Sequence, residues 1–167
     1  MNVHIVHPLE PIFDSRSRVL ILGTMPSPRS REAHFYYAHP RNRFWPTLAA
    51  LFHEELPVGN DARTDFALRH GIALWDVLHS CEINGASDAS IKDAVPNDLS
   101  VILNNAPIQQ VFCTGAKAWS LYHRLIEPKV GLCATRLPSS SPANCAVSSE
   151  RLCEAYSQIL PYLLRAE

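Results

Sequence analysis

The sequence predicts an α/β fold in which a parallel sheet is covered by helices on both faces. Short aliphatic runs closed by Gly, Pro or Ser alternate with segments whose apolar residues recur at a helical spacing. Strands that alternate with helices favour parallel pairing, because each helix carries the chain back across the sheet. The length of 167 residues is enough for one full hydrophobic core, and no break in composition divides it, so we expect a single domain over 1–167.

The first half of the chain is expected to supply two strands and two helices. The run "RVLILGTMP" is closed by Gly and Pro, which is typical of a buried strand that ends in a loop. The first helix has Asn42 as a plausible cap and Pro46 in its first turn, and the second stops at Gly71. The expected elements are strands over 18–26 and 72–78, helices over 42–56 and 61–71, and a polar loop over 80–90.

The second half repeats the alternation of helix and strand. A Thr-Gly turn leads directly into one helix, and Ser148 with Glu150 near the start of the last one is typical of a capped helix. The expected elements are helices over 97–107, 116–127 and 148–166, a strand over 108–115, and a strand that runs into a Ser-Pro loop within 131–144.

Composition limits the class of partner. The formal charge is −1, so a polyanion would have to be held by a local basic cluster and by backbone amides. No apolar run approaches the roughly 18 residues that span a bilayer, and no basic segment followed by an apolar core begins the chain. We therefore expect a cytoplasmic protein with no membrane contact.

No metal site is predicted. The five cysteines are odd in number, lie far apart and include no CxxC pair, so free or buried thiols are expected. His39, His53, His70 and His79 lack a second ligand at helical i, i+4 spacing, and we interpret them as ordinary surface or core residues.

The predicted sheet places four loops at one rim, because ligands of parallel sheets bind at the carboxyl ends of the strands. These loops are "GTMPSP", "WDVLHSC", "CTG" and "LPSSSPAN". In the last of them Ser139, Ser140 and Ser141 precede a helix N-terminus, and their hydroxyls suit an anion such as a phosphate. A helix-entry loop rich in capping residues is the alternative.

Other candidates for ligand contact come from the segment "HFYYAHPRNRFWP" (34–46), which contains five aromatic rings. Its first rings fall in a predicted loop, where one can stack on a base and the rest pack. Asp76 ends the second predicted strand and can accept a hydrogen bond from a ligand N–H. Nearby arginines can follow a nucleic-acid backbone or simply be scattered over the surface; they are Arg29, Arg31, Arg41 and Arg43.

Three motifs in this order, "GTMPSP", "YYAHPRNRFW" and "LPSSSPAN", resemble the uracil-DNA glycosylase superfamily over most of the chain. The aromatic block is similar to the mismatch-specific uracil glycosylases, whereas the first motif and the serine loop resemble the hypoxanthine-DNA (DNA-deoxyinosine) glycosylase branch. The resemblance implies a three-layer α/β/α fold with a four-stranded parallel sheet and no cofactor. It also implies a monomer that hydrolyses the N-glycosidic bond of a deaminated base, hypoxanthine or uracil, in DNA.

The resemblance also implies roles for residues that contact the base. Tyr37 falls where the family places the ring that stacks on the extruded base, and Asn42 falls on an asparagine used in catalysis. Asp76 falls where related enzymes carry a base-reading asparagine. The backbone amides of Gly23 and Thr24 would stabilise the departing base. Phe44 and Trp45 would then be core anchors for this block.

For the DNA strand, the resemblance implies that the serine loop grips the phosphates that flank the lesion. Pro142 and Ala143 would press toward the gap left in the base stack. The implied DNA-binding residues are Ser139, Ser140, Ser141, Pro142, Ala143, Asn144 and Arg41.

Two departures from the family pattern bear on the activity. Met25 stands at the base-binding position where mismatch-specific relatives carry an asparagine that orients the attacking water, and a methionine cannot do so. Either Asn42 takes over this task or the protein binds damage without efficient turnover. Asp76 replaces an amide and, when ionised, offers only acceptors, which suits N1–H of hypoxanthine or N3–H of uracil.

Two further alternatives remain open at this point. A small-molecule nucleotide-binding α/β protein would use the serine loop for one phosphate. An iron–sulfur glycosylase, as in some relatives, would need paired cysteine ligands, and the spacing offers none.

Overall fold

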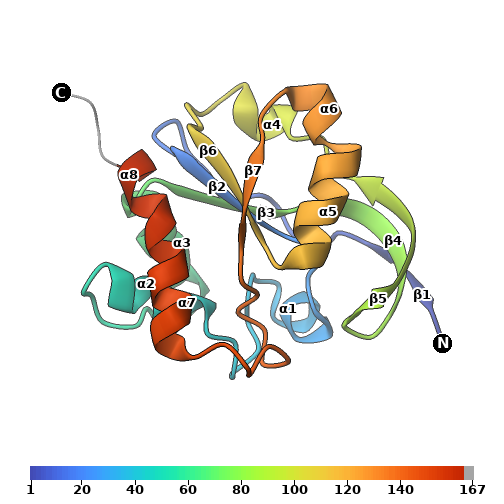
Figure 1. The fold of residues 1–167 in the computed structure, drawn as a ribbon, viewed down its shortest axis with the longest axis horizontal. Helices are drawn as coiled ribbons and strands as arrows, with labels where there is room; N and C mark the ends of the chain where they lie inside the picture. The colour runs from blue at the N-terminus through green and yellow to red at the C-terminus, as the bar shows by residue number, and fades with distance from the viewer. Residues whose placement is uncertain (164–167) are drawn as a thin grey trace.

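A four-stranded parallel sheet forms the centre of the computed structural model, which describes residues 1–163 (Figure 1). Its strand order is β3-β2-β6-β7, and neighbouring strands are parallel. The central strand β2 is buried at every position, as expected for an aliphatic run covered on both faces. The strands are β2 (Val19–Gly23), β3 (Ile72–Asp76), β6 (Gln110–Thr114) and β7 (Ala134–Leu137).

Helices cover both faces of this sheet, so the predicted three-layer α/β/α class is confirmed. In Figure 1, α5 and α6 lie on one side of the strands, and α2, α3 and α7 lie on the other. The helices are α1 (Pro28–Ala33), α2 (Phe44–Leu51), α3 (Asn60–Arg69), α4 (Ser100–Leu103), α5 (Ala116–Leu125), α6 (Glu127–Val130), α7 (Ser149–Tyr156) and α8 (Leu160–Leu163), with a 3₁₀ turn η1 (Ser157–Ile159). Within residues 1–163, no helix has the length and apolar character needed to cross a membrane.

Strand register brings the carboxyl ends of the strands to one edge. Gly23 at the end of β2 pairs with Asp76 at the end of β3, and Thr114 at the end of β6 pairs with Leu137 of β7. The loops that follow β2 and β7, together with α1, gather at the lower edge in Figure 1. The rim predicted from the alternation of strands and helices is therefore present.

A second, antiparallel sheet was not predicted. It has the order β1-β4-β5, with strands β1 (Val3–Val6), β4 (Leu78–Asn84) and β5 (Ser87–Pro96). The expected polar loop over 80–90 is wrong, because these residues form most of a hairpin. Cys81 and Ile83 are buried and alternate with the more exposed Glu82 and Asn84, and Gly85 has a positive φ of 59° in the turn. Two-residue periodicity next to an Asn-Gly turn is a hairpin signal.

Several helix boundaries also differ from expectation. The helix expected over 42–56 ends at Leu51, and the one expected over 97–107 is shortened to Ser100–Leu103, where Asn104 and Asn105 follow and favour a stop. The expected helix over 148–166 begins as predicted, with the Ser148 hydroxyl accepting from the Arg151 N–H at 3.2 Å, but the 3₁₀ turn interrupts it. Its last residues, 164–166, lie outside the described residues.

The aromatic segment is mostly core. Phe35, Tyr36, Phe44 and Trp45 are each at most 6% exposed and belong to the main hydrophobic cluster. The indole N–H of Trp45 donates to the Tyr36 carbonyl at 3.1 Å, which satisfies its buried donor. The expectation that Phe44 and Trp45 anchor the core is confirmed, whereas the loop before them is more buried than its polar context indicated.

Candidate functional site

A cavity of about 320 Å³ opens at the carboxyl ends of the parallel strands. This volume lies at the lower end of the range for small-molecule sites. Residues expected at the base or at the DNA strand gather in its wall, although they come from four separate segments of the chain. Those that line it are Gly23, Thr24, Met25, Tyr37, Asn42, Asp76, Ser139, Ser140, Ser141, Pro142 and Ala143.

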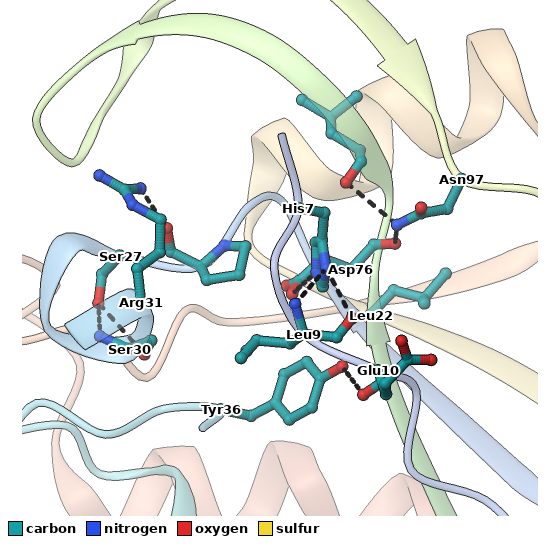
Figure 2. A network of polar contacts seen from close by, with 12 residues as sticks. His7, Leu9, Glu10, Leu22, Ser27, Ser30, Arg31, Tyr36, Asp76 and Asn97 are labelled. Atoms are coloured by element: carbon teal, nitrogen blue, oxygen red, sulfur yellow. Dashed lines mark hydrogen bonds and ion pairs between the residues drawn. The ribbon is translucent and has the colours of Figure 1, made fainter. Parts of the chain in front are cut away.

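Asp76 is buried at the end of β3, with 4% of its surface exposed. Its carboxylate Oδ2 lies 2.8 Å from Nε2 of His7, and its main-chain carbonyl accepts from the Asn97 amide at 2.9 Å (Figure 2). The other oxygen, Oδ1, lies so near Gly23 that a Cβ at that position would approach it to 2.5 Å. Glycine therefore permits the first motif to pass directly over the carboxylate.

Tyr37 lies in the cavity wall in an unusual backbone conformation, with a positive φ of 53°. Its ring is stacked on Phe44 with centroids 3.8 Å apart and planes at 14°. Its hydroxyl lies 3.2 Å from the hydroxyl of Thr114 on β6. Burial, followed by the nearby Asp76 charge, holds the pKa of Tyr37 well above its usual value, so the phenol is neutral.

Asn42 combines a structural contact with a place in the cavity wall. Its Oδ1 accepts a hydrogen bond from the backbone N–H of Phe44 at 2.9 Å, at the first residue of α2. The expectation that Asn42 is the cap is wrong by one position: the N-cap of α2 is Arg43, which makes no side-chain cap bond, and Asn42 binds the first N–H of the helix from the residue before it. Because the donor is a backbone N–H, the side-chain oxygen is identified without ambiguity, and the amide plane is fixed. Oδ1 keeps a second lone pair, and Nδ2 keeps its two N–H donors for other partners.

In the serine loop, the three hydroxyls have different surroundings. Oγ of Ser139 accepts from the N–H of Ser141, and Oγ of Ser141 accepts from the N–H of Ala143, at 3.1 and 3.2 Å. These contacts use lone pairs and leave each O–H free to donate. Ser140, by contrast, is 2% exposed, so its hydroxyl is directed into the protein.

Arg43 connects the serine loop to the aromatic segment. Its guanidinium donates to the carbonyls of Val147 and Asn144 at 2.6 and 2.9 Å, and its backbone N–H donates to the Ser140 carbonyl at 3.1 Å. Arg31 likewise donates to the carbonyl of Pro26 at 2.8 Å. Two of the four arginines considered for contact with a nucleic-acid backbone therefore donate hydrogen bonds to carbonyl groups of the protein itself.

Two predicted DNA-binding residues lie outside the cavity. Arg41 is exposed and does not line it. Asn144 lines a neighbouring groove, which shares Ser139, Ser141 and Ala143 with the cavity. Its amide donates to the Ser139 carbonyl at 2.9 Å, so it closes the loop on itself.

Sequence reasoning missed several cavity residues. Thr114 ends β6 and enters the sequence prediction only as part of the "CTG" loop, and the hairpin tip enters it only as part of the polar loop over 80–90. His7, which pairs with Asp76, lies 69 residues away in a segment without a recognisable motif. The lining residues not singled out from the sequence are Pro26, Ser27, Ser30, Tyr36, Ile83, Gly85, Ala86, Asp88 and Thr114. His39, which the sequence analysis interprets as an ordinary surface or core residue, also lines the cavity. For the hairpin, the Asn-Gly turn was the available signal; for His7 there was none.

Among residues 1–163, no group of three or more His, Cys, Asp or Glu side chains is arranged so that it could bind a metal ion. The cysteines in this part of the chain are free thiols. The polar side chains that line the cavity carry carboxylate, amide and hydroxyl groups and the imidazole of His39.

The fold and the site define the class of protein, and comparison with known proteins identifies the family. The family model described as the uracil DNA glycosylase superfamily matches residues 10–164, so the chain belongs to this superfamily and is a DNA glycosylase, a hydrolase that acts on DNA. A hypoxanthine DNA glycosylase of Methanosarcina barkeri is 33% identical over 135 residues, which are 80% of this chain and 85% of that protein. A hypoxanthine DNA glycosylase of Methanosarcina acetivorans is 31% identical over 84% and 89% of the two chains.

A solved structure supports the same assignment of the fold. The solution NMR structure of a candidate uracil DNA glycosylase from Methanosarcina acetivorans superposes with a TM-score of 0.81. It is 27% identical in sequence, and the match covers 96% of this chain and 99% of that one.

Proposed function

We propose that this DNA glycosylase removes hypoxanthine from DNA, and that the cavity at the strand ends holds the base after it has rotated out of the duplex. The observation that carries the proposal is the buried Asp76 carboxylate in the cavity wall beside Gly23. The names of the two Methanosarcina relatives support the choice of hypoxanthine. The product would be an abasic site, the intermediate of base excision repair.

Base recognition follows from the acceptor at Asp76. Oδ1 of the carboxylate would accept a hydrogen bond from N1–H of hypoxanthine, while backbone amides of the Gly23-Thr24 turn would donate to O6. Met25, also in the wall, would supply apolar contact. Adenine has no hydrogen on N1, so its ring nitrogen would meet the carboxylate as a second acceptor. Uracil presents N3–H beside a carbonyl and is the second expected substrate.

Stacking would hold the extruded base. The ring of Tyr37 is supported on one face by Phe44, and we infer that its other face receives the base. Aromatic stacking of this kind contributes about 1 to 3 kcal/mol per base. Unpairing and unstacking a nucleotide costs a few kcal/mol, so this contact offsets much of the cost of extrusion.

On the strand side, the free O–H groups of Ser139 and Ser141 would donate to the phosphates that flank the lesion. The buried Ser140 and the Arg43 guanidinium would instead keep the loop in shape, since their contacts are within the protein. Pro142 and Ala143 are in the cavity wall at the end of this loop, where they would enter the space left by the base.

Cleavage of the bond develops positive charge on the sugar and negative charge on the departing base. The phosphates held by the serine loop favour the sugar cation, and the donors around the base favour the anion. Asn42 would orient the attacking water through the groups left free by its bond to Phe44. Water adds its oxygen to the sugar carbon as the bond to the base breaks, and the base leaves with a proton.

The test separates the catalytic contribution of Asn42 from its hydrogen bond to the Phe44 N–H. Asn42→Ala removes both, so we expect single-turnover excision from inosine-containing duplex DNA to fall about 100- to 1000-fold and the free energy of unfolding to fall by about 1 kcal/mol. Asn42→Ser keeps an oxygen that can accept from this N–H but lacks the carboxamide, so it should retain stability and lose excision to the same extent.

Two outcomes would contradict the proposal. If both variants excised the base at rates within threefold of wild type, Asn42 would have no role in catalysis. A wild-type protein that binds inosine-containing DNA tightly but forms no abasic sites would favour the rival function, a damage-binding protein, which Met25 in the first motif suggests. The same duplexes with uracil or xanthine in place of hypoxanthine would rank the substrates.

A further inference from the structure

A buried histidine lies behind the proposed base-reading carboxylate. Nε2 of His7 is 2.8 Å from Oδ2 of Asp76, and the two side chains are only 2% and 6% exposed. Figure 2 shows the His7 ring directly beside Asp76 at the end of β3. Burying an ionised carboxylate is costly unless a partner compensates for the lost water. Among residues 1–163, His7 is the side chain that the structure places within hydrogen-bond distance of the Asp76 carboxylate.

The second ring nitrogen makes this contact independent of the charge on His7. Nδ1 lies 3.2 Å from the backbone nitrogen of Leu9 and 3.0 Å from its carbonyl oxygen. A neutral ring can accept from the Leu9 N–H, and a protonated ring can donate to the Leu9 carbonyl. In both of these states Nε2 carries a proton directed to Asp76, and Oδ2 of the carboxylate accepts it; a neutral ring protonated on Nδ1 would instead donate to the Leu9 carbonyl and leave Nε2 as an acceptor.

The backbone on either side of this pair is held in place. The chain after His7 forms a bridge between Ile12 and Leu74 at the edge of β3, and the Tyr36 hydroxyl donates to the carbonyl of Glu10 at 2.6 Å. The His7 ring also packs edge-on against Trp75, with centroids 6.3 Å apart. Neither partner of the pair can therefore move far without breaking other contacts.

We propose that His7 is the residue that fixes base specificity, by holding Oδ2 of Asp76 so that Oδ1 is presented to the base as an acceptor. This inference rests on the proposed function. Because His7 donates a hydrogen bond to the side chain at position 76, the atom nearest to His7 must be an acceptor. The other terminal atom of that side chain then faces the base. An asparagine at 76 would turn its amide oxygen to His7 and present Nδ2–H to the cavity, which is the wrong polarity for an N–H group of the base.

Two substitutions separate this role from simple packing. His7→Gln keeps an N–H donor within reach of Asp76 but removes the ring, whereas His7→Phe keeps the ring and removes the donor. In single-turnover assays on inosine-containing DNA, below the melting temperature of each variant, we expect His7→Gln to retain activity within about fivefold of wild type. His7→Phe should lose at least about 30-fold. The opposite order, with Phe active and Gln inactive, would show that His7 only packs.

A double-mutant cycle tests whether His7 acts through Asp76. Asp76→Asn should abolish most excision, and adding His7→Gln should change the remaining rate by less than about threefold. Adding His7→Phe should be neutral or raise the rate, because the amide is then free to turn its oxygen to the base. Full additivity of the Phe substitution with Asp76→Asn would refute the coupling.

A readout that needs no activity keeps the inference testable if hypoxanthine is not the substrate. In the ¹H–¹⁵N spectrum of protein labelled at histidine, His7 should carry its proton on Nε2 at every pH at which the protein is folded. A neutral ring protonated on Nδ1 would overturn the inference, because Nε2 would then accept from a protonated Asp76. Wild-type protein that shows the expected tautomer but no excision would instead refute the proposed function alone.

Discussion

Gly23 offers the sharpest test of the geometry around the proposed base pocket. A Cβ at this position would lie 2.5 Å from Oδ1 of Asp76 and 3.4 Å from the hydroxyl of Tyr37. To reach an ordinary contact of about 3.4 Å, Oδ1 would have to retreat by about 0.9 Å. His7 lies 2.8 Å from the other oxygen of the same carboxylate, so this retreat would disturb that hydrogen bond as well.

We therefore expect Gly23→Ala to damage both excision and stability. A displacement of about 1 Å in a catalytic arrangement can cost about 100-fold in rate, and overpacking a buried site costs about 1 to 3 kcal/mol. The assay is single-turnover release of hypoxanthine from a duplex, with thermal unfolding measured on the same sample.

Gly131→Ala is the matched control. Gly131 has a φ of 74°, a Cβ added to it would meet no atom within 4 Å, and it precedes β7 at the end remote from the cavity. A side chain in this conformation costs about 1 to 2 kcal/mol, so the control should lose stability but keep the wild-type rate. If Gly23→Ala excised hypoxanthine as fast as Gly131→Ala, the close approach of Gly23 to Asp76 would have no role in the reaction.

Three further predictions concern the contacts with DNA. Tyr37→Ala should weaken binding to inosine-containing DNA by about 1 to 3 kcal/mol, whereas Tyr37→Phe, which keeps the ring, should stay close to wild type; equal losses in a titration would contradict stacking. Ser139→Ala should weaken DNA binding with little change in melting temperature, and Ser140→Ala should do the reverse, because only the latter hydroxyl is buried. Arg41→Ala should reduce the slope of log K against log salt by about 0.9, as expected for one lost phosphate contact; an unchanged slope would place this exposed arginine outside the DNA interface.

The sequence predicted the parts of the fold that depend on local patterns. The aliphatic run of β2 and the Gly-Pro closure after it are sufficient to indicate a buried strand with a functional loop at its end. Parallel pairing then follows from the alternation with helices. Strands β4 and β5 were missed because the polar residues around the Asn-Gly turn resemble a loop unless the buried Cys81 and Ile83 are recognised as alternating.

Contacts between distant segments were beyond prediction. Nothing around His7 indicates that it pairs with a carboxylate 69 residues away, and that contact depends on how the chain after β1 reaches the edge of β3, where Ile12 forms a bridge with Leu74. The serine loop gives a second example. Three identical residues in a row carry no signal that Ser140 is buried while Ser139 and Ser141 are partly exposed, because the Arg43 backbone bond and the packing of the loop decide it.

In the aromatic segment, Tyr37 has an unfavourable backbone conformation that places its ring in the cavity wall. A tyrosine with a positive φ is disfavoured by about 1 to 2 kcal/mol, and such conformations persist only where the surroundings over-determine them. The preceding residue, Tyr36, is fixed by its hydroxyl bond to Glu10 and by the indole N–H of Trp45, while the Tyr37 ring is stacked on Phe44. The buried aromatic residues thus form a rigid support that directs one ring, Tyr37, to the cavity, and this explains why so many of them lie in one short segment.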